Sequence, residues 1–174
     1  MEQATAPQTI DTAWAEEFLE RWEAAWASHD ADQLLDLMTD DIVYDDSASP
    51  ETMRGKDAVR AFAESTWRAF PDLRFEGVGG PLVASDGPRA AFWWRGTGTN
   101  TGPIDPPGIP PTGKRIEFEG ADFHEYRDGK VARLRIVFDM NELGQQLGLV
   151  PAPGSRGERA LVLMQRLKAR ATRG

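Results

Sequence analysis

The dipeptide Asp128-Gly129 constrains the fold more than any other feature of the sequence, because a run of alternating residues lies on each side of it. Asp-Gly favours the two-residue turn that joins antiparallel strands, since both turn positions require a positive φ. Strand side chains point alternately to the two faces of a sheet. We therefore predict a β-hairpin between Ile116 and Asp139, with one face of each strand toward the interior.

Two ionisable side chains lie on the predicted interior face of this hairpin. In the first strand, the interior parity consists of Ile116, Phe118, Asp122, His124 and Tyr126. The other parity is charged, with Phe123 as the exception. In the second strand, one face is apolar and consists of Ala132, Leu134, Ile136 and Phe138; Val131, Arg133, Arg135, Val137 and Asp139 form the other. An aspartate and a histidine among apolar neighbours indicate a site for proton chemistry.

The length of 174 residues fits one domain with a sizeable core. We divide the chain into a flexible N-terminus (1–11), a domain (12–150), and a linker with a basic C-terminal helix (151–174). The absence of cysteine excludes disulfides, thiolate nucleophiles and cysteine-ligated metals. The N-terminal residues have neither a basic start nor an apolar core, and no apolar run approaches the ~20 residues of a membrane span. We therefore predict a cytoplasmic protein.

The net charge of −8 argues against general affinity for nucleic acid. This charge is unevenly distributed: residues 155–174 carry six Lys or Arg and one Glu, whereas the remainder carries 14 basic and 27 acidic residues. A basic tail of this kind can bind RNA or anionic lipid. It lacks aromatic residues for base stacking, which favours a helix that docks on its own domain or on a partner subunit.

Three stretches with helical periodicity precede most of the predicted strands. The first starts at Thr12 and carries an aromatic residue at every fourth position: Trp14, Phe18, Trp22 and Trp26. The second, capped by Asp30 or Asp32, has Leu34, Leu35 and Met38 inward, and the third spans 56–70 before Pro71. Strands are predicted over 41–46, 73–78, 81–84 and 89–99, with loops over 47–55 and 102–113. A helical turn is predicted over 140–147 and a final helix over 158–171.

Helices followed by antiparallel strands predict an α+β domain, in which a curved sheet encloses a pocket beneath three helices. The loop over 102–113 contains five prolines and is therefore stiff. Aromatic stripes at helical spacing usually pack in a core. The large rings here also suit the lining of an apolar cavity.

Several short segments, in this order, resemble one family: the strand Ile42 to Asp46, Arg54-Gly-Lys-Asp-Ala58, Phe70-Pro-Asp-Leu73, Gly96-Thr-Gly-Thr, Pro111-Thr-Gly-Lys114, Arg127-Asp-Gly-Lys130, and Phe138-Asp139 followed by Gln146-Leu-Gly148. From about Trp14 to Leu149 the chain resembles the SnoaL-like polyketide cyclases and ester cyclases of the nuclear-transport-factor-2-like superfamily. The resemblance implies a cone-shaped α+β barrel with a mixed sheet and a deep pocket, usually in a homodimer. It also implies ring closure of a polyketide ester without cofactor or metal.

The resemblance assigns roles to residues near the hairpin. Asp139 matches the family's aspartate after the last strand, and His124 lies near a histidine that assists in characterised cyclases. The chain departs from the family pattern at Leu134-Arg135, where many members have His-Trp. It departs again at Asn100 and Tyr44, positions where histidine is common. These departures leave the reaction open among the activities that the superfamily hosts.

An aldol closure removes a proton next to a carbonyl, stabilises the enolate and protonates the new alkoxide. A carboxyl group can do both proton transfers if burial raises its pKa toward neutrality. We expect Asp139 to be this acid/base, His124 its proton partner, and Asp122 an orienter or second acid. Side chains expected to bind the apolar carbonyl substrate or hold its enolate oxygen are Trp22, Trp26, Tyr44, Trp67, Trp93, Trp94, Asn100 and Arg135.

Structural roles compete with each of these assignments. Asp139 can cap the helical turn after it, and His124 can be a buried structural histidine. Asp122 can form an ion pair with Arg135 across the hairpin. Two other functions also stay open. One is another enzyme on the same scaffold, either an isomerase or an epoxide hydrolase, and the latter could use converging Asp122, Arg135 and Asp139. The other is a non-catalytic binding module, which would have a filled pocket and an Asp139 occupied by capping.

Overall fold

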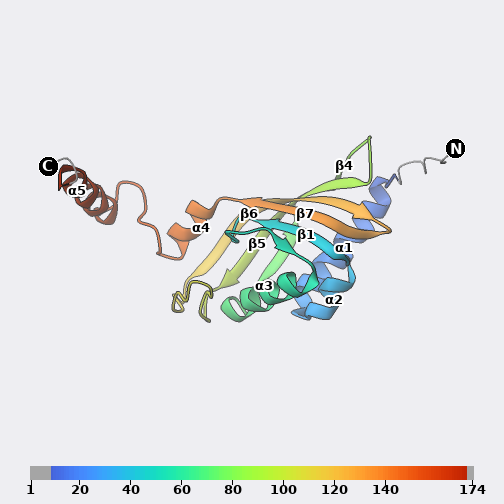
Figure 1. The fold of residues 1–174 in the computed structure, drawn as a ribbon, viewed down its shortest axis with the longest axis horizontal. Helices are drawn as coiled ribbons and strands as arrows, with labels where there is room; N and C mark the ends of the chain where they lie inside the picture. The colour runs from blue at the N-terminus through green and yellow to red at the C-terminus, as the bar shows by residue number, and fades with distance from the viewer. Residues whose placement is uncertain (1–8, 172–174) are drawn as a thin grey trace.

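The predicted hairpin lies at the centre of a seven-stranded, curved mixed sheet (Figure 1). Asp128 and Gly129 have φ angles of 53° and 74°, as the two-residue turn requires. The sheet order is β2-β1-β7-β6-β5-β3, with β4 paired to β5. The strands are β1 (Met38–Asp46), β2 (Met53–Arg54), β3 (Arg74–Gly77), β4 (Leu82–Val83), β5 (Arg89–Thr99), β6 (Arg115–Arg127) and β7 (Lys130–Phe138). Strands β1 and β7 are parallel, and the other pairs in the described chain are antiparallel.

Three helices cover one face of this sheet, as the sequence predicted (Figure 1). The computed structural model describes residues 9–171, so most of the predicted flexible segment 1–11 lies outside the described residues. The helices of the domain are α1 (Thr12–Ser28), α2 (Ala31–Asp36), α3 (Lys56–Ala69) and the short α4 (Met140–Gln146) after β7. None of the helices in the described part of the chain has the length and apolar composition needed to cross a membrane.

Local chemistry explains where the first two helices begin. Asp11 caps α1 by accepting a hydrogen bond from the Trp14 N–H at 2.8 Å, and Asp30 caps α2 in the same way. The aromatic stripe of α1 packs inward, with the rings of Phe18 and Trp22 stacked 6.2 Å apart. This stripe fixes α1 against the interior face of the hairpin, because the Phe18 ring also contacts the Tyr126 ring edge-on at 4.9 Å.

Three details differ from the sequence-based expectation. Met38 begins strand β1 instead of ending the second helix, and it is fully buried. Val131, placed by parity on the charged face, is also fully buried, because the register shifts between Glu125 and Tyr126 and brings Val131 opposite Tyr126. The short strand β2 lies within the predicted loop 47–55.

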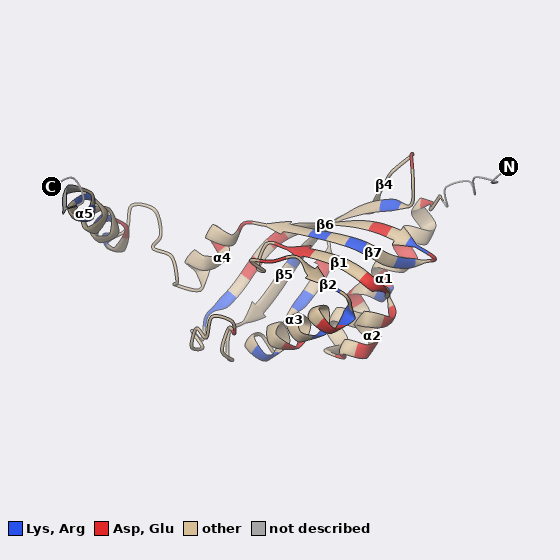
Figure 2. Cartoon of the chain, viewed as in Figure 1, with Lys and Arg blue, Asp and Glu red and all other residues tan. Residues whose placement is uncertain are grey.

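Helix α5 (Arg156–Ala171) lies away from the domain at the end of the linker (Figure 1). Its apolar side chains are exposed, with Leu163, Met164 and Leu167 at 59%, 60% and 55%. Figure 2 shows acidic residues distributed over α1, α2 and the strands of the domain. The predicted docking of this basic helix on its own domain is not present in the structure; docking on a partner subunit stays a prediction.

Candidate active site

A cavity of about 660 Å³ lies between the helical layer and the sheet. Side chains from α1, α3, the interior face of the sheet, the proline-rich loop and α4 line it, and most of them are apolar. Pockets for small organic ligands have volumes of roughly 300–1,000 Å³ and are lined mainly by apolar and aromatic groups with a few polar ones. The cavity has the size and the lining of such a site.

Four of the predicted binding residues line this cavity: Trp22, Trp26, Tyr44 and Trp94. Trp67 is buried behind them, with its ring edge-on to Trp26 and stacked on His29. Trp93 lies on the opposite face of the sheet, is 55% exposed, and donates a hydrogen bond to Glu119 at 3.1 Å. Adjacent residues of a strand face opposite sides, so only one of Trp93 and Trp94 can reach the interior.

The carboxylate of Asp122 is held in place at the cavity wall. Its Oδ1 accepts a hydrogen bond of 2.6 Å from the indole N–H of Trp94, and its Oδ2 lies 3.4 Å from His124 Nε2. The predicted ion pair with Arg135 does not form, because Arg135 is exposed and pairs in register with Phe123, on the outer face. Asp122 therefore faces the cavity with both oxygens positioned by nitrogen groups.

His124 connects Asp122 to a second hydrogen-bonding group. It is 1% exposed, and its Nδ1 lies 3.1 Å from the hydroxyl of Tyr126. A phenol can donate this bond to a neutral imidazole, which leaves Nε2–H to face Asp122. The rings of Phe18, Trp22 and Phe92 surround the imidazole edge-on. His124 does not line the main cavity itself, so it reaches a ligand there through Asp122.

Gly120 permits the contact between Trp94 and Asp122. Gly120 is the register partner of Trp94 across β5 and β6. A Cβ at this position would lie 2.5 Å from Cη2 and Cζ2 of the Trp94 ring, a distance that real side chains do not show. The absence of a side chain lets the indole lie across β6 with its N–H on the carboxylate. The sequence signal for this contact was a glycine at an inward-facing position of the strand, between Phe118 and Asp122.

Asp46 is a second carboxyl group in the cavity, and it was not among the residues predicted to form the site. It lies at the end of β1, is partly buried, and accepts a hydrogen bond of 2.7 Å from the Ala48 N–H. Burial raises the pKa of Asp46 to about 7, and the nearby charge of Asp122 adds to this effect. The sequence signal for Asp46 was the alternation of the strand, which places Asp46 on the same interior face as Ile42 and Tyr44.

The two carboxyl groups belong to one row of residues across neighbouring strands. Asp46 is the register partner of Ile136, and Ile136 is the partner of Asp122. Two strand spacings separate the Cα atoms of the aspartates by about 10 Å. A ligand over Ile136 would lie between one carboxyl of near-neutral pKa and another fixed by hydrogen bonds.

Tyr44 presents a hydroxyl group with no hydrogen-bond partner among the described residues. The side chain is fully buried and lines the cavity. Burial, reinforced by the charges of Asp46 and Asp122, raises the pKa of Tyr44 well above its usual range, so the hydroxyl stays protonated. An unpaired buried donor costs roughly 1–3 kcal/mol, and a ligand oxygen that displaced the side chains covering this hydroxyl would remove that cost.

Three other predicted residues lie outside the cavity lining. Asp139 is exposed and caps α4, with its Oδ1 accepting from the amides of Asn141 and Glu142 at 2.8 and 3.0 Å. Asn100 is fully buried and ties the proline-rich loop to α3, because its amide donates to the carbonyls of Ala69 and Gly102. Arg135 is on the outer face, as described above. Asp139 thus caps α4, as the structural alternative predicted. The catalytic role of Asp139 stays a prediction.

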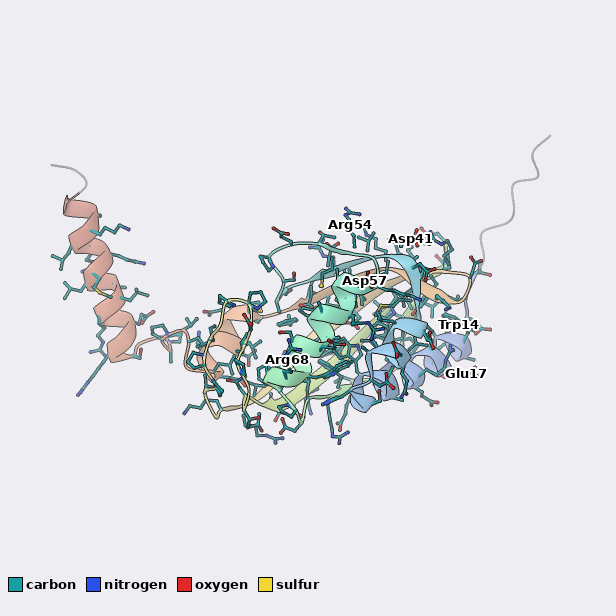
Figure 3. The ribbon with its side chains drawn as sticks, turned by 60° about the horizontal axis from the view of Figure 1, so that its bottom comes forward. Trp14, Glu17, Asp41, Arg54, Asp57 and Arg68 are labelled. Atoms are coloured by element: carbon teal, nitrogen blue, oxygen red, sulfur yellow. The ribbon has the colours of Figure 1, made fainter. Side chains whose placement is uncertain are left out.

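One cation lies among the residues that line the cavity. Arg68 is exposed at the C-terminal end of α3, beside the proline-rich loop (Figure 3). The Ser65 hydroxyl donates to the Asp105 carbonyl and joins this end of α3 to the loop. Within residues 9–171, no group of three or more His, Asp or Glu side chains is arranged to hold a metal ion.

Comparisons with known proteins agree with this architecture. Residues 19–134 match the family model of a SnoaL-like domain. The solved structure of TsrD from Streptomyces laurentii is 25% identical with a TM-score of 0.69, covering 81% of this chain and 99% of that one. AclR, a putative hydroxylase from Streptomyces galilaeus, is 25% identical with a TM-score of 0.69, covering 92% and 98%.

A putative polyketide cyclase from Pseudomonas putida is also 25% identical, with a TM-score of 0.67 and coverage of 76% and 96%. Among curated protein sequences, none matches the chain. The segment that matches the family model extends from α1 into β7 and includes Tyr44, Asp46, Asp122 and His124. By this match and by its fold, the chain belongs to the family of SnoaL-like domains.

Proposed function

We propose that the protein is an enzyme that closes a ring on a small apolar carbonyl compound by general acid/base chemistry, without a cofactor or a metal. The observation that carries this proposal is an apolar cavity with two carboxyl groups on one row of its wall, of which Asp46 has a pKa of about 7. A pKa near the working pH suits a group that must both accept and donate a proton.

The proposed roles follow from the position of each group. Asp46 removes the proton next to the substrate carbonyl and later returns a proton. Tyr44 donates a hydrogen bond to the enolate oxygen, since its hydroxyl is protonated and free of protein partners among the described residues. Asp122, held by Trp94 and His124, is the second acid. The apolar walls exclude water and hold the flat carbon skeleton.

Two other functions have less geometric support. The side chains expected of an epoxide hydrolase do not converge, because Arg135 is exposed on the outer face and Asp139 caps α4. A non-catalytic binding module would also have Asp139 in a cap, but its pocket would be filled. Here the cavity measures about 660 Å³. An isomerase that moves one proton remains the second candidate, because it would use the same two carboxyl groups.

The first step can be tested without the natural substrate. We would incubate the protein in D2O with 2-acetylnaphthalene, an aromatic methyl ketone, and follow deuteration of the methyl group by NMR. Quenching of tryptophan fluorescence measures binding in parallel, since Trp22, Trp26 and Trp94 line the cavity. Catalysed exchange that is lost in Asp46→Asn, with binding retained, supports the proposal. Binding without exchange in the wild type contradicts the proposed proton transfer, and absence of both overturns the proposal.

The assembly and the location of the protein also remain proposals. We infer a homodimer, because α5 carries an exposed apolar stripe and the domain has the opposite net charge. We also propose a cytoplasmic location.

A further inference from the structure

A chain of hydrogen-bonding groups joins the main cavity to a second, smaller pocket. The second pocket has a volume of about 200 Å³ and is lined by Thr9, Ile10, Asp11, Trp14, Pro88, Tyr126 and Gly129. Tyr126 borders this pocket, Asp122 borders the main cavity, and the buried His124 lies between them. The successive distances are 3.1 Å from the Tyr126 hydroxyl to His124 Nδ1 and 3.4 Å from His124 Nε2 to Asp122 Oδ2.

We propose that Tyr126 and His124 form a proton route that connects Asp122 to water in the second pocket. In the inward direction, the Tyr126 hydroxyl gives its proton to His124 Nδ1 while His124 Nε2 gives its proton to Asp122 Oδ2. Tyr126 takes a replacement proton from water in the second pocket, and the hydroxide ion that remains there passes to bulk solvent. One O–H and one N–H bond break along the chain, and one N–H and one O–H bond form, so the imidazole ends with one proton as it began.

The other contacts of these groups leave no second route through polar side chains of the described residues. The indole nitrogen of Trp94 is only a donor, so it orients Asp122 but cannot carry a proton to it. Aromatic rings surround His124 on its remaining sides. Burial raises the pKa of Tyr126 well above its usual range, so Tyr126 enters the chain as a protonated donor.

The route has a purpose in the proposed function, on which this part of the inference rests. A ligand that fills the main cavity separates Asp122 from water on that side. The carboxyl group can then renew its proton only through the protein. A route through Tyr126 lets Asp122 act as an acid while the substrate stays enclosed.

The experiment measures the route itself and needs no substrate. The chain contains two histidines, so labelling with [15N]histidine gives one signal set for His124 and one for the internal control His29. We would measure the rate at which the His124 Nε2 proton exchanges with solvent, in the wild type and in Tyr126→Phe. The route predicts at least tenfold slower exchange in Tyr126→Phe, with His29 unchanged. A purely structural role for Tyr126 predicts the opposite, because loss of its hydrogen bond would loosen the site and speed exchange.

A second measurement uses the wild type alone and remains available if the variant folds poorly. Saturating 2-acetylnaphthalene blocks the main cavity, and the route predicts that His124 Nε2 exchange continues at a similar rate. Suppression of exchange by the ligand would place proton entry at the main cavity and overturn the proposal, as would a His124 protonated at Nδ1. Either result leaves the deuteration test of Asp46 unaffected, so the two proposals fail separately.

Discussion

Asp46 and Asp122 lie on either side of Ile136, in one row that crosses three adjacent strands and faces the cavity. Their surroundings differ. Asp46 has one backbone hydrogen bond and a pKa of about 7, whereas Asp122 has an indole N–H on one oxygen and an imidazole near the other. Two carboxyl groups in different environments beside one ligand site are a recurring arrangement for separate acid and base roles.

Asp46→Asn is expected to lower turnover by roughly 10²–10⁴-fold with the fold retained, because the amide keeps the bond to Ala48 but cannot exchange a proton. Asp45→Asn is the matched control. Asp45 is the next residue of the same strand, does not line the cavity and pairs with Arg133. Turnover of both variants is measured with circular dichroism as the check of folding, and an active Asp46→Asn protein removes Asp46 from the mechanism.

The raised pKa of Asp46 also predicts a pH dependence of stability. The folded state binds this proton more tightly than the unfolded state, where an aspartate has a pKa of about 3.9. The contribution is therefore fully present below pH ~4 and is lost as the pH rises through about 7, by at most about 4 kcal/mol. Urea unfolding of the wild type and of Asp46→Asn between pH 4 and 8 gives the difference. A difference that does not change with pH contradicts the raised pKa.

The fold was predictable from the sequence where the constraint is local. Asp128-Gly129 determines the turn, and parity places Asp122 and His124 inside. Parity cannot show that a register shift buries Val131, because the shift depends on pairing with β1 as well as β6. Met38 was predicted to lie in a helix because its spacing from Leu34 and Leu35 fits the helical period of 3.6 residues. An apolar residue there also fits the start of a strand, whose period is 2.

The site was harder to predict, because its residues come together only in the sheet. Asp46 is 76 positions from Asp122 in the chain, and the parallel pairing of β1 with β7 brings them into one row. Asp139 was predicted to be the acid/base because it matches an aspartate in the family pattern. Its position after a strand and before a helix equally fits a cap, and capping is the arrangement that the structure contains.

Tyr44→Phe is expected to separate stability from activity. Removal of an unpaired buried hydroxyl should leave the free energy of unfolding unchanged or raise it by about 1 kcal/mol, while turnover falls roughly 10²-fold. The chain has one other tyrosine as a control. Tyr126→Phe loses its contact with His124 and should lower stability by about 1 kcal/mol. A loss of stability in Tyr44→Phe would show that its hydroxyl has a partner.

Substitutions at Asp139 distinguish its two predicted roles. Asp139→Ser keeps a capping oxygen without a titratable group, so stability should change by only a few tenths of a kcal/mol and turnover should stay within a few-fold. Asp139→Ala removes the cap and should cost about 1 kcal/mol. Chemical denaturation and turnover are measured for both. Loss of turnover in a stable Asp139→Ser protein would restore Asp139 as the acid/base.

Helix α5 is expected to act in assembly and not in the stability of the domain. Leu163→Ser with Leu167→Ser interrupts the exposed stripe, and Val162→Ser on another side of the helix is the control. We expect the stripe variant to reduce the oligomer size measured by light scattering, with the unfolding midpoint unchanged. Co-sedimentation with anionic vesicles that depends on the stripe would instead assign α5 to a membrane surface, and an unchanged size would count against docking between subunits.

The parallel contact between β1 and β7 means that the row of Asp46, Ile136 and Asp122 is completed late in synthesis, after most of the domain. Residues 38–46 leave the ribosome early and can pair with β2, yet they gain β7 as their second neighbour only when residues 131–136 follow. A product that stops before β7 would lack the surface on which a ligand could rest between the two acids. Translation of β7 and completion of this wall of the cavity therefore coincide.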